Sequence, residues 1–161
     1  EPLTSIAAMV KAHPDLMIGA GTVLDMDQVQ AVADVGGKLI VSPNCDVEVI
    51  QRTKALNMQS WPGIFTPTEA FAALNAGADG LKLFPGNMAG PGGLIAMRAI
   101  LPKNTQVYAV GGAGPDNFGE WVAASVDGFG IGSAIYKPGM NAADVKARAK
   151  DIVSAYDAAF A

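Results

Sequence analysis

The sequence predicts an α/β fold, and within that class a (β/α)8 barrel of the TIM type that lacks its first two strands. Short apolar segments start at residues 16, 39, 59, 80, 106 and 128, which leaves 20 to 26 residues between successive starts. Helical patterns fill the intervals, as is typical of a parallel sheet with crossover helices. Glycine-rich turns follow the last two segments, where barrels build a phosphate site after strands seven and eight.

The predicted strands are short and apolar, with glycine or proline at or near their ends. In chain order they are Leu16–Ala20, Leu39–Ser42, Gln59–Gly63, Gly80–Phe84, Gln106–Val110 and Gly128–Ile131. If the last two are strands seven and eight of a barrel, these segments are strands three to eight. The chain also opens on a helical segment, Pro2–Ala12, with no strand ahead of it. We therefore expect a single barrel domain over residues 1–161, truncated at its N-terminus.

The predicted helices begin at residues that favour helix caps. Thr66-Pro67-Thr68-Glu69 has the form of a capping box with proline at the first helical position, and its helix should end near Gly77. The other caps predict three more helices: Asp25 before Met26–Val35, Asp46 before a helix to Leu56, and Asn141 before a helix from Ala142 to about Phe160.

Composition excludes several classes of protein. The chain has 161 residues, of which 50% are hydrophobic and 16% charged, with a formal net charge of −4. Such an acidic chain argues against nucleic-acid binding, and no apolar run reaches the roughly 18 residues of a membrane span. Cys45 is the only cysteine and His13 the only histidine, so we expect no internal disulfide and no metal site. These features fit a cytoplasmic protein.

Lys82 is the strongest candidate for chemistry. It lies inside the apolar segment Gly80–Phe84, where a lysine is rarely buried because desolvating its ammonium is costly. The same cost lowers the pKa of the amine and leaves a neutral nucleophile, which can form a Schiff base with a carbonyl substrate. The alternative is a lysine at a strand end that reaches water or pairs with a carboxylate.

Two strand ends favour phosphate binding. Gly111-Gly112 follows one predicted strand, and Gly130-Ile131-Gly132-Ser133 spans the end of the next. Backbone N–H groups in such turns can hold a phosphate dianion, although ordinary tight turns also use glycine. Lys137 follows closely and could add positive charge, but a solvated surface lysine is the simpler interpretation.

None of the predicted strands carries an aspartate or glutamate at its C-terminal end, where the active site of a barrel lies. Schiff-base chemistry needs a general acid–base group to form the carbinolamine and to move protons. Either strands ahead of this chain supply that group, or the chain is a non-catalytic phosphosugar-binding barrel fragment.

The chain contains the segments IGAGTV (18–23), IVSPN (40–44), FTPTEA (65–70), LKLFP (81–85) and AVGG (109–112). In order and spacing, these segments resemble the class I aldolases that cleave 2-keto-3-deoxy-6-phosphogluconate or 2-keto-3-deoxy-6-phosphogalactonate to pyruvate and glyceraldehyde 3-phosphate. The resemblance runs from about residue 1 to the final helix. It implies that Lys82 forms the Schiff base and that the enzyme uses no metal or organic cofactor. Members of the family are typically homotrimers.

The resemblance also implies roles for other residues. Thr22, Pro43 and Phe84 correspond to residues that line the substrate pocket. Gly111, Gly112 and Ser133 correspond to phosphate ligands, and Gly132 lies in the same turn as Ser133. The family's catalytic glutamate and a substrate-binding arginine lie on strands one and two, which would precede this chain.

Val110 bears on the choice of substrate. The phosphogluconate enzymes usually carry threonine before the Gly-Gly pair, whereas the phosphogalactonate enzymes carry valine, as this chain does. Threonine can hydrogen-bond a C4 hydroxyl and valine cannot, so this position can distinguish the C4 epimers. We therefore expect a phosphogalactonate aldolase, with a phosphogluconate aldolase as the alternative.

Overall fold

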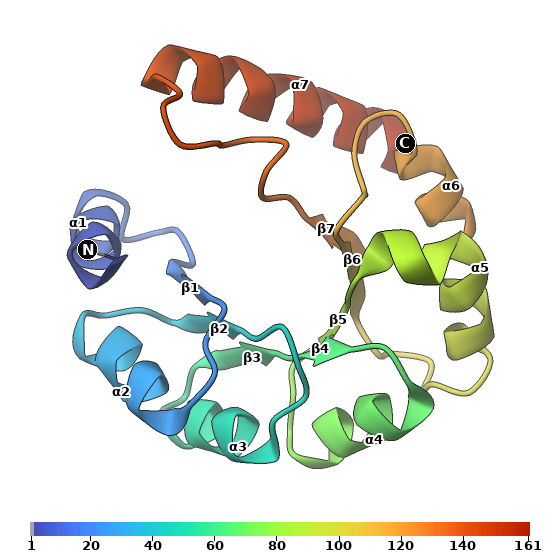
Figure 1. The fold of residues 1–161 in the computed structure, drawn as a ribbon, viewed down its shortest axis with the longest axis horizontal. Helices are drawn as coiled ribbons and strands as arrows, with labels where there is room; N and C mark the ends of the chain where they lie inside the picture. The colour runs from blue at the N-terminus through green and yellow to red at the C-terminus, as the bar shows by residue number, and fades with distance from the viewer. Residues whose placement is uncertain (1) are drawn as a thin grey trace. The chain divides into compact units, whose positions relative to one another are not determined.

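The computed structural model describes residues 2–161, which form two compact units. The first unit ends at Lys82 and the second runs from Leu83 to Ala161. Strands and helices alternate in both units, as Figure 1 shows. The predicted α/β class is therefore confirmed. No helix among residues 2–161 combines the length and the apolar character that crossing a membrane requires.

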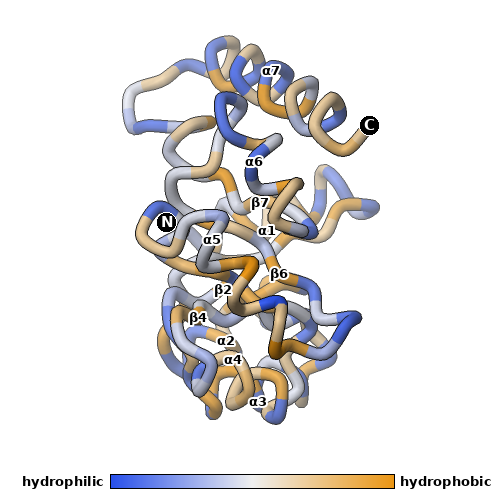
Figure 2. The backbone as a smooth tube through the Cα atoms, turned by 90° about the vertical axis from the view of Figure 1, so that its right-hand side faces the viewer, coloured by the Kyte–Doolittle hydropathy of each residue, from blue (hydrophilic) through white to orange (hydrophobic). Residues whose placement is uncertain are grey.

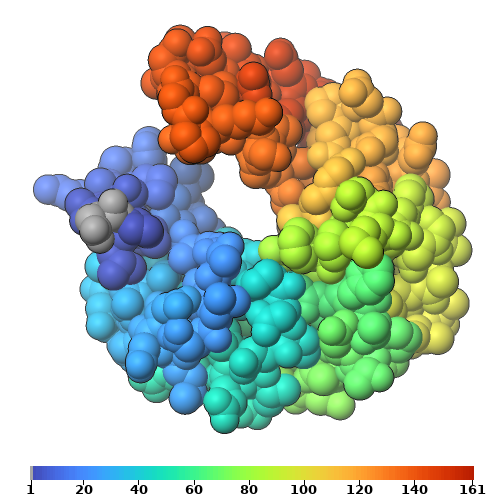
Figure 3. All heavy atoms as spheres, viewed as in Figure 1, coloured from blue at the N-terminus to red at the C-terminus, as the bar shows by residue number. Residues whose placement is uncertain are grey.

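The first unit contains a parallel sheet of β1, β2 and β3, in that order. The sheet is in register along the row Ala20, Ile40 and Ser60. The helices α2, α3 and α4 are neighbours in this unit, because α2 contacts α3 and α3 contacts α4. In Figure 3 the corresponding segments follow one another from blue to green. Its elements are α1 (Pro2–Ala12), β1 (Gly19–Gly21), α2 (Met26–Asp34), β2 (Leu39–Val41), α3 (Val47–Ala55), β3 (Gln59–Trp61), β4 (Gly63–Ile64) and α4 (Pro67–Asn75).

The strand β5 (Leu81–Leu83) spans the boundary between the units. In the second unit, β6 and β7 pair in parallel, with Ala109 opposite Phe129. The other elements of this unit are α5 (Gly86–Arg98), β6 (Val107–Val110), α6 (Phe118–Ala123), β7 (Gly128–Gly130) and α7 (Ala142–Phe160).

Two predicted strands differ from the structure. The strand expected at Leu16–Ala20 lies at Gly19–Gly21, because Leu16 belongs to a turn in which its N–H donates to the carbonyl of His13 at 3.1 Å. The strand expected at Gln59–Gly63 is divided into β3 and β4 by Pro62. Proline has no N–H for the strand ladder, which explains the break.

The predicted helix caps are all present. The Asp25 carboxylate accepts a hydrogen bond from the Gln28 N–H at 2.8 Å. In the capping box, the Glu69 N–H donates to Thr66 Oγ1 at 3.3 Å and the Thr66 N–H donates to Glu69 Oε2 at 2.8 Å. Asp46 and Asn141 cap α3 and α7 in the same way. These caps satisfy backbone donors that the first helical turn leaves without partners.

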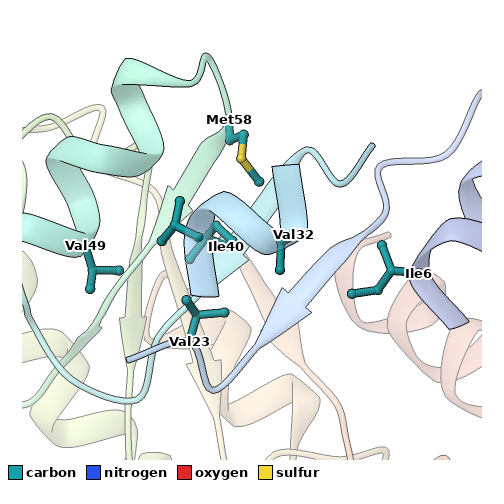
Figure 4. Packing of buried hydrophobic residues seen from close by; sticks show 7 residues of the cluster. Ile6, Val23, Val32, Ile40, Val49 and Met58 are labelled. Carbon is teal, nitrogen blue, oxygen red and sulfur yellow. The ribbon is translucent and has the colours of Figure 1, made fainter. Parts of the chain in front are cut away.

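The core of the first unit lies between its sheet and its helices. Ile40 in the central strand β2 is fully buried among apolar side chains from α1, α2 and α3 and from the connections between elements (Figure 4). The buried residues of this cluster are Ile6, Val23, Val29, Val32, Ile40, Val49 and Met58. Burial of this apolar surface holds the sheet against its helices.

An aromatic cluster attaches α7 to the second unit. The ring of Phe129 in β7 stacks on Phe118 of α6 with 4.2 Å between centroids. Tyr156 and Phe160 of α7 meet the same ring at 6.3 and 6.2 Å. Hydrophobic and hydrophilic residues are mixed along α7 (Figure 2), and Tyr156 and Phe160 provide its aromatic contacts to Phe129.

In the first unit, the Asp79 carboxylate links several segments of the chain at the start of β5, and we call this set of hydrogen bonds a staple. Its carboxylate accepts hydrogen bonds from Lys54 Nζ at 2.7 and 2.6 Å and from the Ser60 N–H at 2.8 Å. A Cβ on the next residue, Gly80, would lie 2.4 Å from the Trp61 ring. The staple therefore ties α3 and β3 to the strand that carries Lys82.

The second unit repeats this arrangement at the start of β7. The Asp127 carboxylate accepts a hydrogen bond from the Val107 N–H at 2.6 Å and pairs with Arg98. A Cβ on Gly128 would lie 2.9 Å from the Tyr108 ring. Both staples lie at the N-terminal ends of strands, the face of barrel folds that serves stability.

Candidate functional site

Lys82 lies in the middle of β5, between Leu81 and Leu83. The two leucines share one face of the strand and Lys82 occupies the other, because successive side chains alternate. The backbone N–H of Lys82 donates to the Pro62 carbonyl at 2.9 Å. The Lys82 side chain is placed by this strand, and only 9% of the residue is exposed.

Burial lowers the pKa of the Lys82 amine below its ordinary value of 10.5. Desolvation penalises the ammonium form, so a larger fraction of the amine is neutral near pH 7 than for a lysine in water. The small exposed fraction argues against the alternative in which the lysine reaches out to solvent. Lys82 therefore has the burial and the shifted pKa of a nucleophilic lysine.

Phe84 and Gly111 lie together in the second unit. The Phe84–Pro85 peptide bond is cis, and α5 begins directly after it. The ring of Phe84 lies 3.6 Å from the position that a Cβ on Gly111 would occupy. This contact brings a predicted substrate-pocket residue against the predicted phosphate turn.

The Gly111-Gly112 turn adopts a backbone that requires glycine. The φ angles of the two residues are 90° and 79°, in the left-handed region. A Cβ on Gly112 would also lie 2.6 Å from the Cβ of Asn87. Among residues 2–161, the N–H groups of Gly111 and Gly112 donate no hydrogen bond to another protein group, so both remain available to a ligand.

Val110 lies at the end of β6, just before this turn. Its Cγ2 atom is 2.6 Å from the position of a Cβ on Gly130 in the neighbouring strand β7. The side chain therefore extends across the end of β7. The predicted specificity residue is half-buried at the C-terminal end of the β6–β7 pair.

Gly132 and Ser133 follow β7 in an exposed turn. The Gly132 carbonyl accepts hydrogen bonds from the N–H groups of Ile135 and Tyr136 at 2.9 and 3.1 Å. Arg148 of α7 donates a hydrogen bond to the Ala134 carbonyl at 3.3 Å, and this bond links α7 to the turn. No protein atom lies within 4 Å of a Cβ built on Gly132, so the space beside this residue is open.

Thr22 and Pro43 belong to the first unit. The strands that precede them, β1 and β2, are neighbours in the sheet, and both residues lie just beyond the strand ends. Thr22 is exposed and has a φ of 61°, a left-handed backbone that is unusual for a β-branched residue. Pro43 is half-buried, and its carbonyl oxygen leaves no room for a side chain on Gly63. Strain of the Thr22 kind clusters at functional sites.

The sequence alone predicted no role for Asn117, which lies beside the predicted phosphate turn. Asn117 Nδ2 donates to the Gly112 carbonyl at 2.8 Å, and its Oδ1 accepts from the Gly114 N–H at 3.0 Å. An asparagine five residues after a Gly-Gly pair was the available signal, because asparagine often bonds to nearby backbone groups in turns.

Comparison with known proteins identifies the family of the chain. Residues 2–150 match the family "Aldolase: KDPG and KHG aldolase". The chain is 49% identical to the "Probable 2-dehydro-3-deoxy-6-phosphogalactonate aldolase" of Rhizobium meliloti (strain 1021), over 99% of the chain and 76% of the relative. It is 45% identical to the "2-dehydro-3-deoxy-6-phosphogalactonate aldolase" of Escherichia coli (strain K12), over 94% of the chain and 75% of the relative.

The fold agrees as well. A solved structure described as "Native KDPGal structure" matches with a TM-score of 0.94 and 44% identity, over 97% of this chain and 76% of that one. The family match covers most of the chain, and both relatives align along nearly all of it. The chain therefore belongs to the KDPG and KHG aldolase family, whose members are carbon–carbon lyases.

Proposed function

We propose that this chain is a class I aldolase that cleaves 2-keto-3-deoxy-6-phosphogalactonate to pyruvate and glyceraldehyde 3-phosphate. The observation that carries the proposal is the burial of Lys82 inside β5, with the pKa of its amine lowered. The names of the two relatives above support the substrate. We also propose that residues 1–161 act as one domain.

The reaction begins when the neutral Lys82 amine attacks the C2 ketone. The carbinolamine loses water to give an iminium, which accepts the electron pair of the C3–C4 bond as that bond breaks. The C4 hydroxyl loses its proton and becomes the aldehyde of glyceraldehyde 3-phosphate. The remaining enamine takes a proton at C3, and hydrolysis of the resulting iminium releases pyruvate and restores the amine.

In this proposal the phosphate is held by backbone N–H groups of Gly111, Gly112 and Gly132 and by Ser133, through its N–H and hydroxyl. We also propose that Thr22, Pro43 and Phe84 each contact the substrate. The free N–H groups of the Gly111-Gly112 turn and the open space beside Gly132 support this assignment. Successive backbone N–H groups in such turns form anion-binding concavities.

Borohydride trapping tests the role of Lys82. Pyruvate and borohydride should add covalent mass to Lys82, and Lys82→Met should abolish the adduct while leaving the fold intact. Lys38→Met is a matched control, because Lys38 is exposed at the start of β2. Trapping that survives Lys82→Met would refute the assignment.

A methyl group tests the phosphate site. Gly132→Ala places the methyl in open space, so it should disturb phosphate and not the fold. Gly119→Ala on α6 is the control, since a Cβ there also meets nothing within 4 Å. We expect Gly132→Ala alone to weaken binding of glyceraldehyde 3-phosphate in calorimetry. Equal binding by both variants would place the phosphate elsewhere.

A non-catalytic phosphosugar-binding role is the second candidate. It is favoured by one observation: within residues 2–161, no aspartate or glutamate lies at the C-terminal end of a strand, where the catalytic groups of barrel enzymes lie. Aldol chemistry needs a general acid–base group, which typically contributes on the order of 100- to 10,000-fold in rate. Phosphate binding without pyruvate trapping would select this candidate over the aldolase.

The assembly and location complete the proposal. We expect a homotrimer, which sedimentation velocity would test against a monomer. Phe65 and Phe71 in the first unit are exposed apolar side chains, which supports association. A phosphorylated sugar acid crosses membranes poorly because its charges are costly to desolvate, so we place the reaction in the cytoplasm.

A further inference from the structure

We propose that Asn117 is a positioning residue that holds the Gly111-Gly112 turn in the conformation that receives the substrate phosphate. The inference rests on the proposed function, since it assumes that phosphate binds at this turn. Asn117 is not itself a phosphate ligand in the proposal. It acts through the backbone of Gly112 and Gly114.

The contacts of Asn117 lie on the C-terminal side of the turn, at Gly112 and Gly114. Its Nδ2 donates to the Gly112 carbonyl at 2.8 Å, and its Oδ1 accepts from the Gly114 N–H at 3.0 Å. Both distances are those of well-formed hydrogen bonds. Because each peptide unit is planar, fixing one carbonyl and one N–H fixes the orientation of two consecutive peptide units after Gly112.

Asn117 makes these bonds in place of a helix cap. It is the N-cap residue of α6, yet its side chain makes no capping bond to that helix. The comparable N-cap Asn141 behaves in the usual way, because its Oδ1 accepts from the Asp144 N–H at 2.9 Å. An N-cap asparagine normally stabilises its own helix. Asn117 does not stabilise its own helix in this way, and both polar groups of its amide instead bond to the backbone of Gly112 and Gly114.

The turn needs an external restraint because it is built from two glycines. Gly111 and Gly112 both have positive φ, a region that glycine enters about as readily as the negative one. Asn87 lies against Gly112 on one side, since its Cβ is 2.6 Å from the position that a Cβ on Gly112 would occupy. The Asn117 bonds fix the carbonyl of Gly112, a restraint that packing alone does not supply.

The expected effect follows from the cost of ordering this backbone. Restricting one residue to a single backbone conformation corresponds to a factor of about 5 to 30 in an equilibrium constant. If Asn117 orders the turn before phosphate binds, then without Asn117 the turn must be ordered during binding. The free energy of that ordering is then subtracted from the free energy of phosphate binding. We therefore expect phosphate affinity to fall by about 5- to 30-fold in Asn117→Ala.

Asn117→Asp provides a second, nearly isosteric variant. Aspartate keeps an oxygen acceptor for the Gly114 N–H and is an equally good N-cap residue, so α6 should remain folded. It replaces the donor to the Gly112 carbonyl by a carboxylate oxygen, which repels that carbonyl. Phosphate affinity should fall in this variant as well, although thermal stability is kept.

The experiment measures inorganic phosphate and glyceraldehyde 3-phosphate binding by calorimetry in the whole chain and in both variants. Pyruvate trapping at Lys82 and the unfolding temperature are measured in parallel. We expect weaker phosphate binding with little change in trapping, since pyruvate carries no phosphate. Asn141→Ala is the matched control: it removes a true N-cap and should lower stability without weakening phosphate binding.

The outcomes separate this inference from the proposed function. Phosphate binding that Gly132→Ala weakens but neither Asn117 variant changes would overturn the role of Asn117 and leave the phosphate site standing. Equal losses of phosphate affinity in Asn117→Ala and Asn141→Ala would also overturn it, because general destabilisation would explain both. Absence of phosphate binding in the unmodified chain would refute the phosphate site itself, and the inference with it.

Discussion

Replacing Thr22 by glycine is expected to stabilise the protein while weakening the substrate site. Thr22 has a φ of 61°, and the left-handed conformation costs a non-glycine residue roughly 1–2 kcal/mol. Glycine removes that strain, but its larger freedom in the unfolded chain offsets about 0.5–1 kcal/mol. Because the residue is exposed, little packing is lost. The net gain is therefore about 0–1.5 kcal/mol, and each kcal/mol raises the unfolding temperature by about 2–4 °C for a chain of this size.

Calorimetric unfolding and pyruvate trapping together test this reasoning. Asn57→Gly is the matched control: Asn57 has a φ of 56°, but asparagine tolerates this region, so its replacement should change stability little. Thr22→Ser keeps a hydroxyl and should retain trapping better than Thr22→Gly if that hydroxyl binds substrate. A Thr22→Gly variant that is less stable than the parent, or that traps pyruvate unchanged, would refute the view that strain is retained here for function.

Three further predictions follow from single residues. Val110→Thr should raise kcat/KM for the phosphogluconate epimer relative to the phosphogalactonate epimer, by about 5-fold if one hydrogen bond to the C4 hydroxyl is gained; an unchanged ratio would exclude this position as the specificity determinant. Arg98→Ala should lower the free energy of unfolding in urea by roughly 2–4 kcal/mol, since its guanidinium is largely buried and bonds three groups. Lys54→Ala should lower the free energy of unfolding by less, because the ion pair of Lys54 is more exposed. Lys82→Met should raise the free energy of unfolding at pH 7, because the pKa of Lys82 is lower in the folded than in the unfolded chain. This gain in stability should shrink as the pH approaches 10.5, where the unfolded chain also loses the charge. A gain in stability that is independent of pH would contradict the burial of the Lys82 charge.

Local signals in the sequence determined the order and type of the elements. The capping box at Thr66 and Glu69 and the N-cap at Asp25 involve residues only three positions apart, so they act before any tertiary contact forms. The apolar run around Lys82 likewise predicted a buried strand, and the structure confirms it. Motif order was enough to predict the family.

Longer-range packing decided what the sequence left open. The division of the predicted strand Gln59–Gly63 into β3 and β4 at Pro62 depends on which neighbouring strand each half pairs with. The pattern of residues along the sequence does not contain that information. The staple at Asp79 joins residues 25 positions apart, and its geometry exists only once α3 and β5 are in place.

The same holds for the finer features of the site. The strained backbone of Thr22 and the two bonds of Asn117 depend on how the chain leaves each strand, which residue type alone does not specify. The sequence by itself therefore determined the class of fold and the place of the candidate nucleophile, Lys82, on a buried strand. The tertiary structure decided the conformation of the turns around them, because those turns are held by contacts between residues that only folding brings together.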